Sequence, residues 1–295
     1  MADTGPTPSQ RAAALSIWKG PVEPTPVSGG TTNVNLMVLD GGERYVVRVG
    51  EDLPVHQIMR FNERAAARAA FEAGISPEVV HTESGIMVMR FVEGRTCLAA
   101  DIRDAERLKL ILPLLKRVHR VLPRFLYGPV LAFWPFHVIH DYAHTLEKAG
   151  SRYASRLPDL VDVAASLELA VGPIDLVFGH NDLLPQNFID DGARLWLIDW
   201  DYAGFNSMLF DLGGLASNNE LTTAEAEFML DRYFGRGDPV LERRFRAMRC
   251  ASLLREAMWS MISECHSTLE FDFARYTEMN LSRFERAYAA FPEYA

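Results

Sequence analysis

The chain has 295 residues, of which 48% are hydrophobic, so it can bury one large core or the cores of two lobes. Its formal net charge of −9 argues against non-specific binding of nucleic acids or anionic membranes, and fits a small neutral or cationic partner. The 3 cysteines are far apart, and neither a signal-peptide core nor a run of about 18 apolar residues is evident. These features predict a cytoplasmic protein without a disulfide framework, a zinc site or a membrane span.

The first segments of the chain predict a helix followed by strands. Thr7 and Gln10 are placed to form a capping box, with Pro8 at the first helical position, and they favour a helix over residues 7–20. Three strand-like segments follow, at residues 22–29, 32–40 and 43–51. The glycines of the DGGE turn at residues 40–43 allow the last two segments to form a hairpin.

An alanine-rich segment at residues 54–74 comes next. It begins with a proline and ends at Gly74, which predicts a single helix with a glycine stop. Residues 77–82 and 85–94 then have strand character, so the N-terminal part is predicted to be rich in β-structure.

Beyond residue 95 the apolar spacing is mainly helical. The predicted helices lie at residues 105–122, 136–149, 157–171, 223–234 and within 240–290. Strand character returns only at residues 176–180, 186–190 and 194–200. This order predicts an α+β fold, with a small β-rich lobe at residues 1–92 and a larger helical lobe at residues 93–295. A small-molecule site is expected in the cleft between the lobes.

The segment GHNDLLPQNF, at residues 179–188, places polar side chains between two apolar strands. Asp182 and Asn187 can point into one cavity, and Asp199 ends the next strand, where a lone buried carboxylate would be costly. A Mg²⁺ ion would offset that cost. The spacing matches phosphoryl-transfer enzymes, in which the first aspartate meets the substrate hydroxyl and the other two residues bind metal. The alternative is that Asp182 and Asn187 only cap a turn, but the later aspartate argues against it.

Several longer stretches support the same chemistry. They are GHNDLLPQNFI, LIDWDYAGFNSMLFDLGG, SGGTTNVNL, YVVRVG, the helix with Glu63, MRFVEGRT and MWSMISE…EFDFARY. With these stretches the chain resembles the choline/ethanolamine kinase branch of the aminoglycoside-phosphotransferase-like kinases. The resemblance implies a bilobal protein-kinase-like fold, in which residues 1–92 bind the nucleotide and residues 93–295 carry the catalytic and acceptor-binding groups.

The resemblance also implies roles for the residues around the central motif. Asp182 would be the catalytic base, or would orient the attacking hydroxyl, while Asn187 and Asp199 would be Mg²⁺ ligands. His180 would support the loop by hydrogen bonding to the backbone, and Asp211 would brace the same loop or the start of the next helix.

The nucleotide side is implied by residues of the N-terminal lobe. A loop over ATP would contain Ser28, Gly29, Gly30 and Asn33. Arg48 would contact phosphate, and Glu63 on the next helix would orient it. Backbone groups near Arg90 and Val92 would hydrogen-bond adenine. Family members often carry an acidic residue where Arg90 stands, a departure of little consequence if recognition is through the backbone. Without the resemblance, Arg48 and Glu63 would be interpreted as solvent-exposed charges.

The acceptor side is implied by the C-terminal helices and by Asp201, which would face the positive charge of the substrate. Glu256, Trp259, Phe273 and Tyr276 would surround an amine, because aromatic faces attract cations. Eukaryotic members of the family carry an aromatic residue where Glu256 stands and a tyrosine where Phe273 stands. Glu256 could therefore favour a primary or methylated amine over choline. The alternative is that Trp259 and Tyr276 belong to an ordinary helix–helix core.

The predicted function is that of an ATP- and Mg²⁺-dependent kinase of a small amino alcohol, with choline first and ethanolamine second. The alternatives are a kinase of the same fold that acts on an aminoglycoside, thiamine or a sugar, and a catalytically inactive scaffold. No nucleic-acid partner is expected, and the protein is expected to be a monomer or a homodimer.

Overall fold

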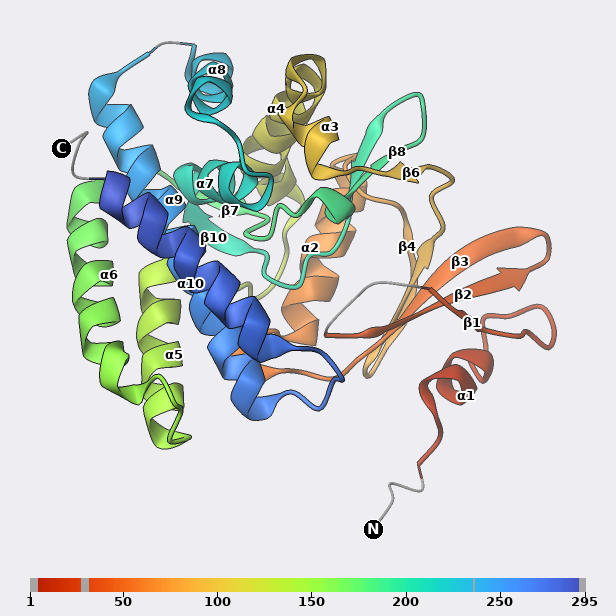
Figure 1. Ribbon diagram of the computed structural model, residues 1–295. Coiled ribbons are helices and arrows are strands. Elements are labelled where there is room, and N and C mark those ends of the chain that lie inside the picture. Colours follow the sequence, from red (N-terminus) through yellow and green to blue (C-terminus); the bar gives the residue numbers. More distant parts are fainter. Residues whose placement is uncertain (1–4, 28–31, 236, 292–295) are drawn as a thin grey trace.

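The computed structural model describes residues 5–27, 32–235 and 237–291, and its N-terminal part is built on a five-stranded antiparallel sheet (Figure 1). The strands lie in the order β1-β2-β3-β5-β4. Their bounds are Thr25–Pro26 for β1, Val34–Asp40 for β2, Glu43–Val49 for β3, Val79–Glu83 for β4 and Ile86–Arg90 for β5. Together with the helices that follow, this sheet confirms the predicted α+β fold class.

The central strand β3 separates a small core from the rest of the molecule. Val47 is buried with Leu36 and Val88 on the face that packs against α1 (Pro8–Ala13). Because successive strand residues point to opposite faces, the neighbouring Arg48 points away from this core. The pairing of Arg48 with Asn35 on β2 and Met87 on β5 holds it in the middle of the sheet.

Helix α2 (Arg60–Glu72) lies between the sheet and the helical part of the chain (Figure 1). Four of its alanines, Ala66, Ala67, Ala69 and Ala70, are buried in the main core, which lets the helix approach its neighbours closely. The predicted helix from residue 54 is wrong at its start, since Pro54–His56 form the short 3₁₀ helix η1 and Gln57 has φ 60°. That left-handed residue interrupts the helical hydrogen-bond pattern. The first predicted helix is also shorter than expected, because α1 ends at Ala13.

The larger part of the molecule is a group of helices around α9. Their bounds are Ala99–Arg103 for α3, Ala105–Arg120 for α4, Pro135–Lys148 for α5, Leu157–Val171 for α6, Met208–Asn218 for α7, Thr223–Phe234 for α8, Pro239–His266 for α9 and Phe273–Ala290 for α10. Helix α9 contacts α5, α6, α7 and α10, and α10 crosses in front of it in Figure 1. The segment 240–290 predicted to be helical is thus two helices, joined by residues 267–272.

Short strands hold the central loops in place. Strand β7 (Leu176–Gly179) pairs with β10 (Gly204–Ser207). Strand β8 (Phe188–Asp190) pairs with both β6 (Arg95–Thr96) and β9 (Leu195–Leu197). The loop that leaves β7 ends in the 3₁₀ helix η4 (Pro185–Asn187). The Ile198 N–H donates to the Asn187 carbonyl over 2.9 Å, so this loop and the segment after β9 lie side by side.

The chain crosses from the sheet to the helical part between β5 and β6. Strand β5 ends at Arg90, whereas β6 already pairs with β8. A lobe boundary at residues 92–93 falls within this crossing and stays a prediction.

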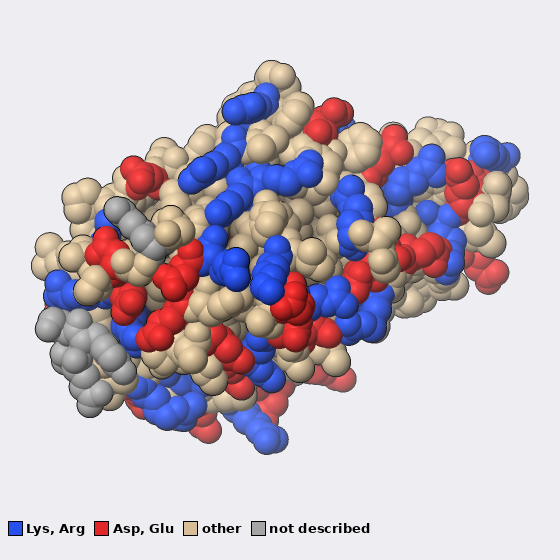
Figure 2. Space-filling model, turned by 90° about the horizontal axis from the view of Figure 1, so that it is seen from above, with Lys and Arg blue, Asp and Glu red and all other residues tan. Residues whose placement is uncertain are grey.

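The surface of the molecule carries both signs of charge. Lys and Arg side chains gather across the middle of the face seen from above, with Asp and Glu to either side (Figure 2). A locally basic surface therefore exists on a chain whose formal net charge is −9. Among the described residues, no helix has the length and apolar character that a membrane crossing requires.

Candidate active site

A cavity of about 550 Å³ lies between the sheet, the central loops and the C-terminal helices. This size is within the usual range for small-molecule sites, about 300–1,000 Å³. Its wall includes most of the described residues predicted for the site, namely Arg48, Arg90, Val92, Asp182, Asn187, Asp199, Asp201, Glu256, Trp259, Phe273 and Tyr276. Residues from four separate parts of the sequence thus meet at one place.

The loop after β7 is held from below by Asp211, in the first turn of α7. One Asp211 oxygen accepts from the backbone N–H of His180 at 2.9 Å, and the other accepts from that of Asn181 at 2.7 Å. His119 on α4 lies 2.8 Å from the first oxygen. Burial alone would raise the pKa of Asp211, but the hydrogen bonds from the His119 ring and the His180 backbone N–H keep the pKa below its ordinary value. Asp211 is therefore a buried carboxylate that fixes the loop. The contact of His119 with this carboxylate was not predicted from the sequence.

His180 joins the two central loops. Its Nε2 lies 2.9 Å from the Ile198 carbonyl, and its Nδ1 accepts from the Asp182 N–H at 3.3 Å. Burial lowers the pKa of His180. A neutral ring with its proton on Nε2 satisfies both contacts, so His180 supports the loop through the backbone.

Asp182 projects into the cavity from this loop. Burial raises its pKa to about 8; Arg255 lowers the pKa, whereas Glu256 and Asp199 add to the increase. A carboxyl group with a pKa near neutrality is suited to accept a proton from a substrate hydroxyl.

Asn187 and Asp199 lie beside Asp182 with oxygen atoms available to a cation. The Asn187 amide nitrogen donates to the Asp182 carbonyl at 2.9 Å, which leaves the amide oxygen for another partner. Asp199 has φ 69° and a side chain that is 30% exposed, so a strained backbone presents this carboxylate to the cavity. Among the described residues, no cluster of three or more His, Cys, Asp or Glu side chains could hold a metal. The pair instead fits Mg²⁺, which takes one or two protein carboxylates and completes its shell with phosphate and water.

Arg48 is the centre of a buried charge network. Its guanidinium contacts Glu63 at 2.9 Å, Asp199 at 2.7 Å and Asp201 at 3.3 Å. Arg60 at the start of α2 contacts Glu63 and Asp201, each at 2.7 Å. The predicted partners Arg48 and Glu63 thus meet, and Arg60 is a further member that the sequence did not reveal.

The structure gives protein partners to Asp201, which was predicted to face the amine of a substrate. One of its oxygens accepts from Arg60. The other accepts from Arg48, from the Thr32 hydroxyl at 2.8 Å and from the Asn33 amide at 3.2 Å. Both oxygens are thus occupied and the residue is 4% exposed, so a role toward the amine stays a prediction. Asp201 joins the sheet to the central loops, and Asn33 turns toward it.

The structure describes only some of the other residues that were predicted to contact the nucleotide. Ser28, Gly29 and Gly30 lie outside the described residues. The Arg90 N–H already donates to the Glu78 carbonyl at 2.9 Å, and the Arg90 side chain pairs with Glu43 and Glu78. Backbone recognition of adenine by Arg90 would therefore have to use its carbonyl, while Val92 lines the cavity.

Aromatic side chains from α9, α10 and the segment between them form the far wall. The ring of Trp259 lies 6.2 Å from that of Phe273 and 6.5 Å from that of Tyr276, with near edge-to-face geometry. Phe271, which was not singled out in the sequence, lies 5.7 Å from Tyr276. The Trp259 indole N–H donates to the Tyr202 hydroxyl at 2.8 Å, which fixes the orientation of the indole.

Glu256 lies in this wall with both oxygens engaged. One accepts from the Tyr276 hydroxyl at 2.8 Å, and the other lies 3.1 Å from Arg255. Arg255 is 4% exposed and stands over the ring of Tyr202 at 5.2 Å. The sequence LREAMW pointed to Glu256 and Trp259 but not to Arg255, whose charge offsets that of the glutamate.

Together, the fold and this cavity define a small-molecule phosphotransferase of the protein-kinase-like class. The chain matches the group described as "Phosphotransferase enzyme family" over residues 23–248, and it belongs to that family.

Named relatives support the more specific resemblance. Protein LicA of Haemophilus influenzae is 27% identical over 258 residues, which cover 83% of this chain and 75% of that protein. A choline/ethanolamine kinase family protein from Mesorhizobium loti has a TM-score of 0.72 at 27% identity, covering 95% of this chain and 96% of that one. Choline kinase LicA from Streptococcus pneumoniae has a TM-score of 0.75 at 25% identity, covering 90% and 92%. The predicted kinase family and fold are therefore confirmed.

Proposed function

We propose that the chain transfers the γ-phosphoryl group of ATP to the hydroxyl of a small amino alcohol, with choline as the first candidate and ethanolamine as the second. The observation that carries this proposal is a single cavity that joins Asp182, Asn187 and Asp199 to an aromatic wall around Trp259. Phosphoryl transfer requires the first group, which positions reactants and neutralises charge. Recognition of a cationic acceptor requires the second.

Asp182 is the proposed acceptor of the substrate proton. The hydroxyl of the amino alcohol would donate a hydrogen bond to its carboxylate, and the oxygen would attack the γ-phosphorus as the proton passes to Asp182. ADP leaves as the bond to its β-phosphate oxygen breaks. The pKa of about 8 makes Asp182 a competent base near neutral pH, while His180 and Asp211 hold its loop in position.

The nucleotide would bind on the sheet side of the cavity. Asn187 and Asp199 would hold Mg²⁺, which would neutralise charge on the phosphates. Arg48 is anchored by Glu63 and can meet a phosphate oxygen if it exchanges its contact with Asp199. Val92 and the loop with Ser28, Gly29 and Gly30 complete the nucleotide side of the proposal.

The amine would lie against Trp259, Phe271, Phe273 and Tyr276. Each cation–aromatic contact contributes on the order of 0.5–2 kcal/mol. A primary ammonium would have to compete with Arg255 and Tyr276 for the oxygens of Glu256. A trimethylammonium group needs only the aromatic faces and the nearby charge, which favours choline over ethanolamine. Aminoglycosides and sugars carry many hydroxyl groups, which this aromatic wall cannot satisfy.

The proposal includes a cytoplasmic site of action, because ATP is the donor and Cys97, Cys250 and Cys265 are free thiols. The cavity is built from one chain, so a monomer suffices, and a homodimer is the other expected state.

ADP release with a panel of acceptors tests the function. The panel contains choline, ethanolamine, N-methylated ethanolamines, thiamine, an aminoglycoside and a sugar, with Asp182→Asn as the matched control enzyme. We expect the highest kcat/KM with choline and little release from the variant. A higher kcat/KM with an aminoglycoside, thiamine or a sugar would refute the acceptor class. Absence of ADP release with every acceptor would refute kinase activity and leave the scaffold alternative.

A further inference from the structure

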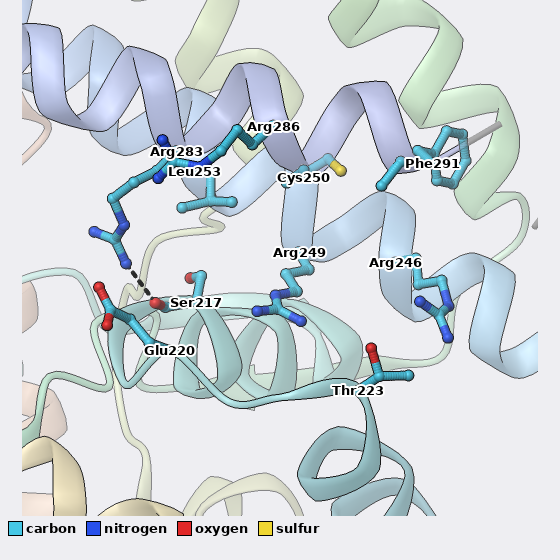
Figure 3. A pocket seen from close by; sticks show the side chains of 12 residues that line it. Ser217, Glu220, Thr223, Arg246, Arg249, Cys250, Leu253, Arg283, Arg286 and Phe291 are labelled. Atoms are coloured by element: carbon cyan, nitrogen blue, oxygen red, sulfur yellow. Dashed lines mark hydrogen bonds between the residues drawn. The ribbon is translucent and has the colours of Figure 1, made fainter. Parts of the chain in front are cut away.

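A second cavity lies where α7 and the start of α8 approach α9 and α10 (Figure 3). Its volume is about 450 Å³, which is enough for a small molecule. Helix α9 contributes Arg246 and Arg249 to its wall, and α10 contributes Arg283 and Arg286. Figure 3 shows the guanidinium groups of Arg249 and Arg283 extending from their helices toward α7. Two helices thus direct positive charge into one hollow.

The wall of this cavity carries more positive than negative charge. Among the described residues that line it, Glu220 is the single acidic side chain beside four arginines. Glu227, which lies 4.0 Å from Arg246, and Glu242 belong to a neighbouring small pocket that shares Arg246 and Arg249. Burial lowers the pKa of Arg249, and the positive charges of Arg246 and Arg283 lower it further. Like charges held together in this way repel one another, and a bound anion would relieve that repulsion.

Holding α7 in place uses only part of the hydrogen-bonding capacity of these arginines. Arg249 donates to the Leu221 carbonyl at 2.9 Å, and Arg283 donates to the Ser217 carbonyl at 2.6 Å. A guanidinium has five N–H donors. The Arg249 Nε is buried and has no hydrogen-bond partner in the described part of the chain, which is costly unless a ligand supplies one. The site therefore keeps donors beyond those that a structural role needs.

We propose that this cavity binds a small polyanion that carries phosphate groups. Guanidinium groups match phosphate oxygens in geometry and in charge, and several arginines can share one di- or polyanion. A carboxylate monoanion would leave most of the positive charge unpaired. Cys250, Leu253, Ala287 and Phe291 give the cavity an apolar side that fits the non-phosphate part of a phosphate ester or a nucleotide.

The site is separate from the candidate active site, although the same two helices carry both. Arg249 and Trp259 are both on α9, and their spacing corresponds to about 15 Å along the helix axis. Arginine substitutions here can therefore be examined without touching the groups proposed to bind ATP or the acceptor.

Titration calorimetry of the full chain with inorganic pyrophosphate tests the proposal. We expect Arg249→Gln/Arg286→Gln to weaken binding on the order of 100-fold, since two charge-assisted hydrogen-bonding groups are lost. The matched control is Arg275→Gln, an exposed arginine on α10 about 16 Å along the axis from Arg286, and it should bind like the wild type. The double variant should keep the wild-type KM for ATP and for choline.

A single variant separates ligand binding from folding. Arg286 is exposed and bonds to Ser282 on its own helix, so Arg286→Gln should fold normally and weaken pyrophosphate binding about 10-fold. Competition by phosphocholine or by ATP that disappears in the arginine variants would identify a phosphomonoester or a nucleotide as the source of the phosphate. Equal pyrophosphate affinity in wild type and Arg286→Gln would overturn the proposal, as would a wild type that does not bind pyrophosphate.

Discussion

The contact between Asp211 and the loop after β7 gives the sharpest prediction. In Asp211→Asn one carboxylate oxygen becomes an amide nitrogen, which cannot accept a hydrogen bond. If the remaining oxygen keeps the contacts with His180 and His119, the amide nitrogen faces the N–H of Asn181. The variant therefore keeps the side-chain volume and removes a buried, charge-assisted bond from the loop that carries Asp182.

The cost can be estimated from these contacts. One lost charge-assisted bond amounts to about 1.5–3 kcal/mol, and weakening the other two from charged to neutral adds roughly 1–2 kcal/mol. The expected destabilisation is therefore about 3–5 kcal/mol, which lowers the Tm of a chain of this size by roughly 6–10 °C. The loop should also lose its geometry, so kcat should fall more than the KM for ATP rises.

The effect should depend on pH. The folded-state pKa of Asp211 lies below its ordinary value, so its contribution is present above the ordinary carboxyl pKa and is lost as the pH falls through the folded-state pKa. Urea unfolding at pH 7 and at progressively lower pH should therefore show the difference between wild type and variant shrinking in acid. Asp159→Asn, an exposed aspartate in the first turn of α6, is the matched control. Equal unfolding free energies for the two variants at pH 7 would show that Asp211 does not brace the loop.

Four further predictions concern the active site. Asp182→Ala should lower kcat by about 10²–10⁴ with ADP release as the assay, and near-normal turnover would exclude a catalytic role. Because the pKa of Asp182 is raised to about 8 and the base must be ionised, kcat/KM should rise with pH through that value and level off above it; a flat profile from pH 6 to 10 would contradict this. Trp259→Ala should raise the KM for the amine acceptor on the order of 10-fold and leave the KM for ATP little changed, whereas equal increases would indicate a folding role. Activity should need Mg²⁺ or Mn²⁺, and full turnover in EDTA would exclude the metal role of Asn187 and Asp199.

The chemistry of the central loop was readable from the sequence because it is local. Asp182 and Asn187 lie on one short segment, and Asp199 follows after the short strands β8 and β9, so spacing alone predicted that they share a cavity. Arg48 and Glu63 were predicted as a pair on the resemblance, and the structure brings them to 2.9 Å. The helix boundaries were less predictable, since Gln57 at φ 60° interrupts a segment whose composition favours a continuous helix.

Only the tertiary structure decided which carboxylates are already partnered. Asp201 was expected to face an amine, but Arg60, 141 positions earlier in the sequence, occupies one of its oxygens. His119 beside Asp211 and Arg255 beside Glu256 were likewise invisible, because hydrogen bonds and burial set their roles. The sequence by itself determined the reaction class, since the residues for phosphoryl transfer lie within one local pattern. The charge balance of the acceptor pocket and the arginine-lined cavity arise from packing of helices α7, α9 and α10, which residue spacing alone does not reveal.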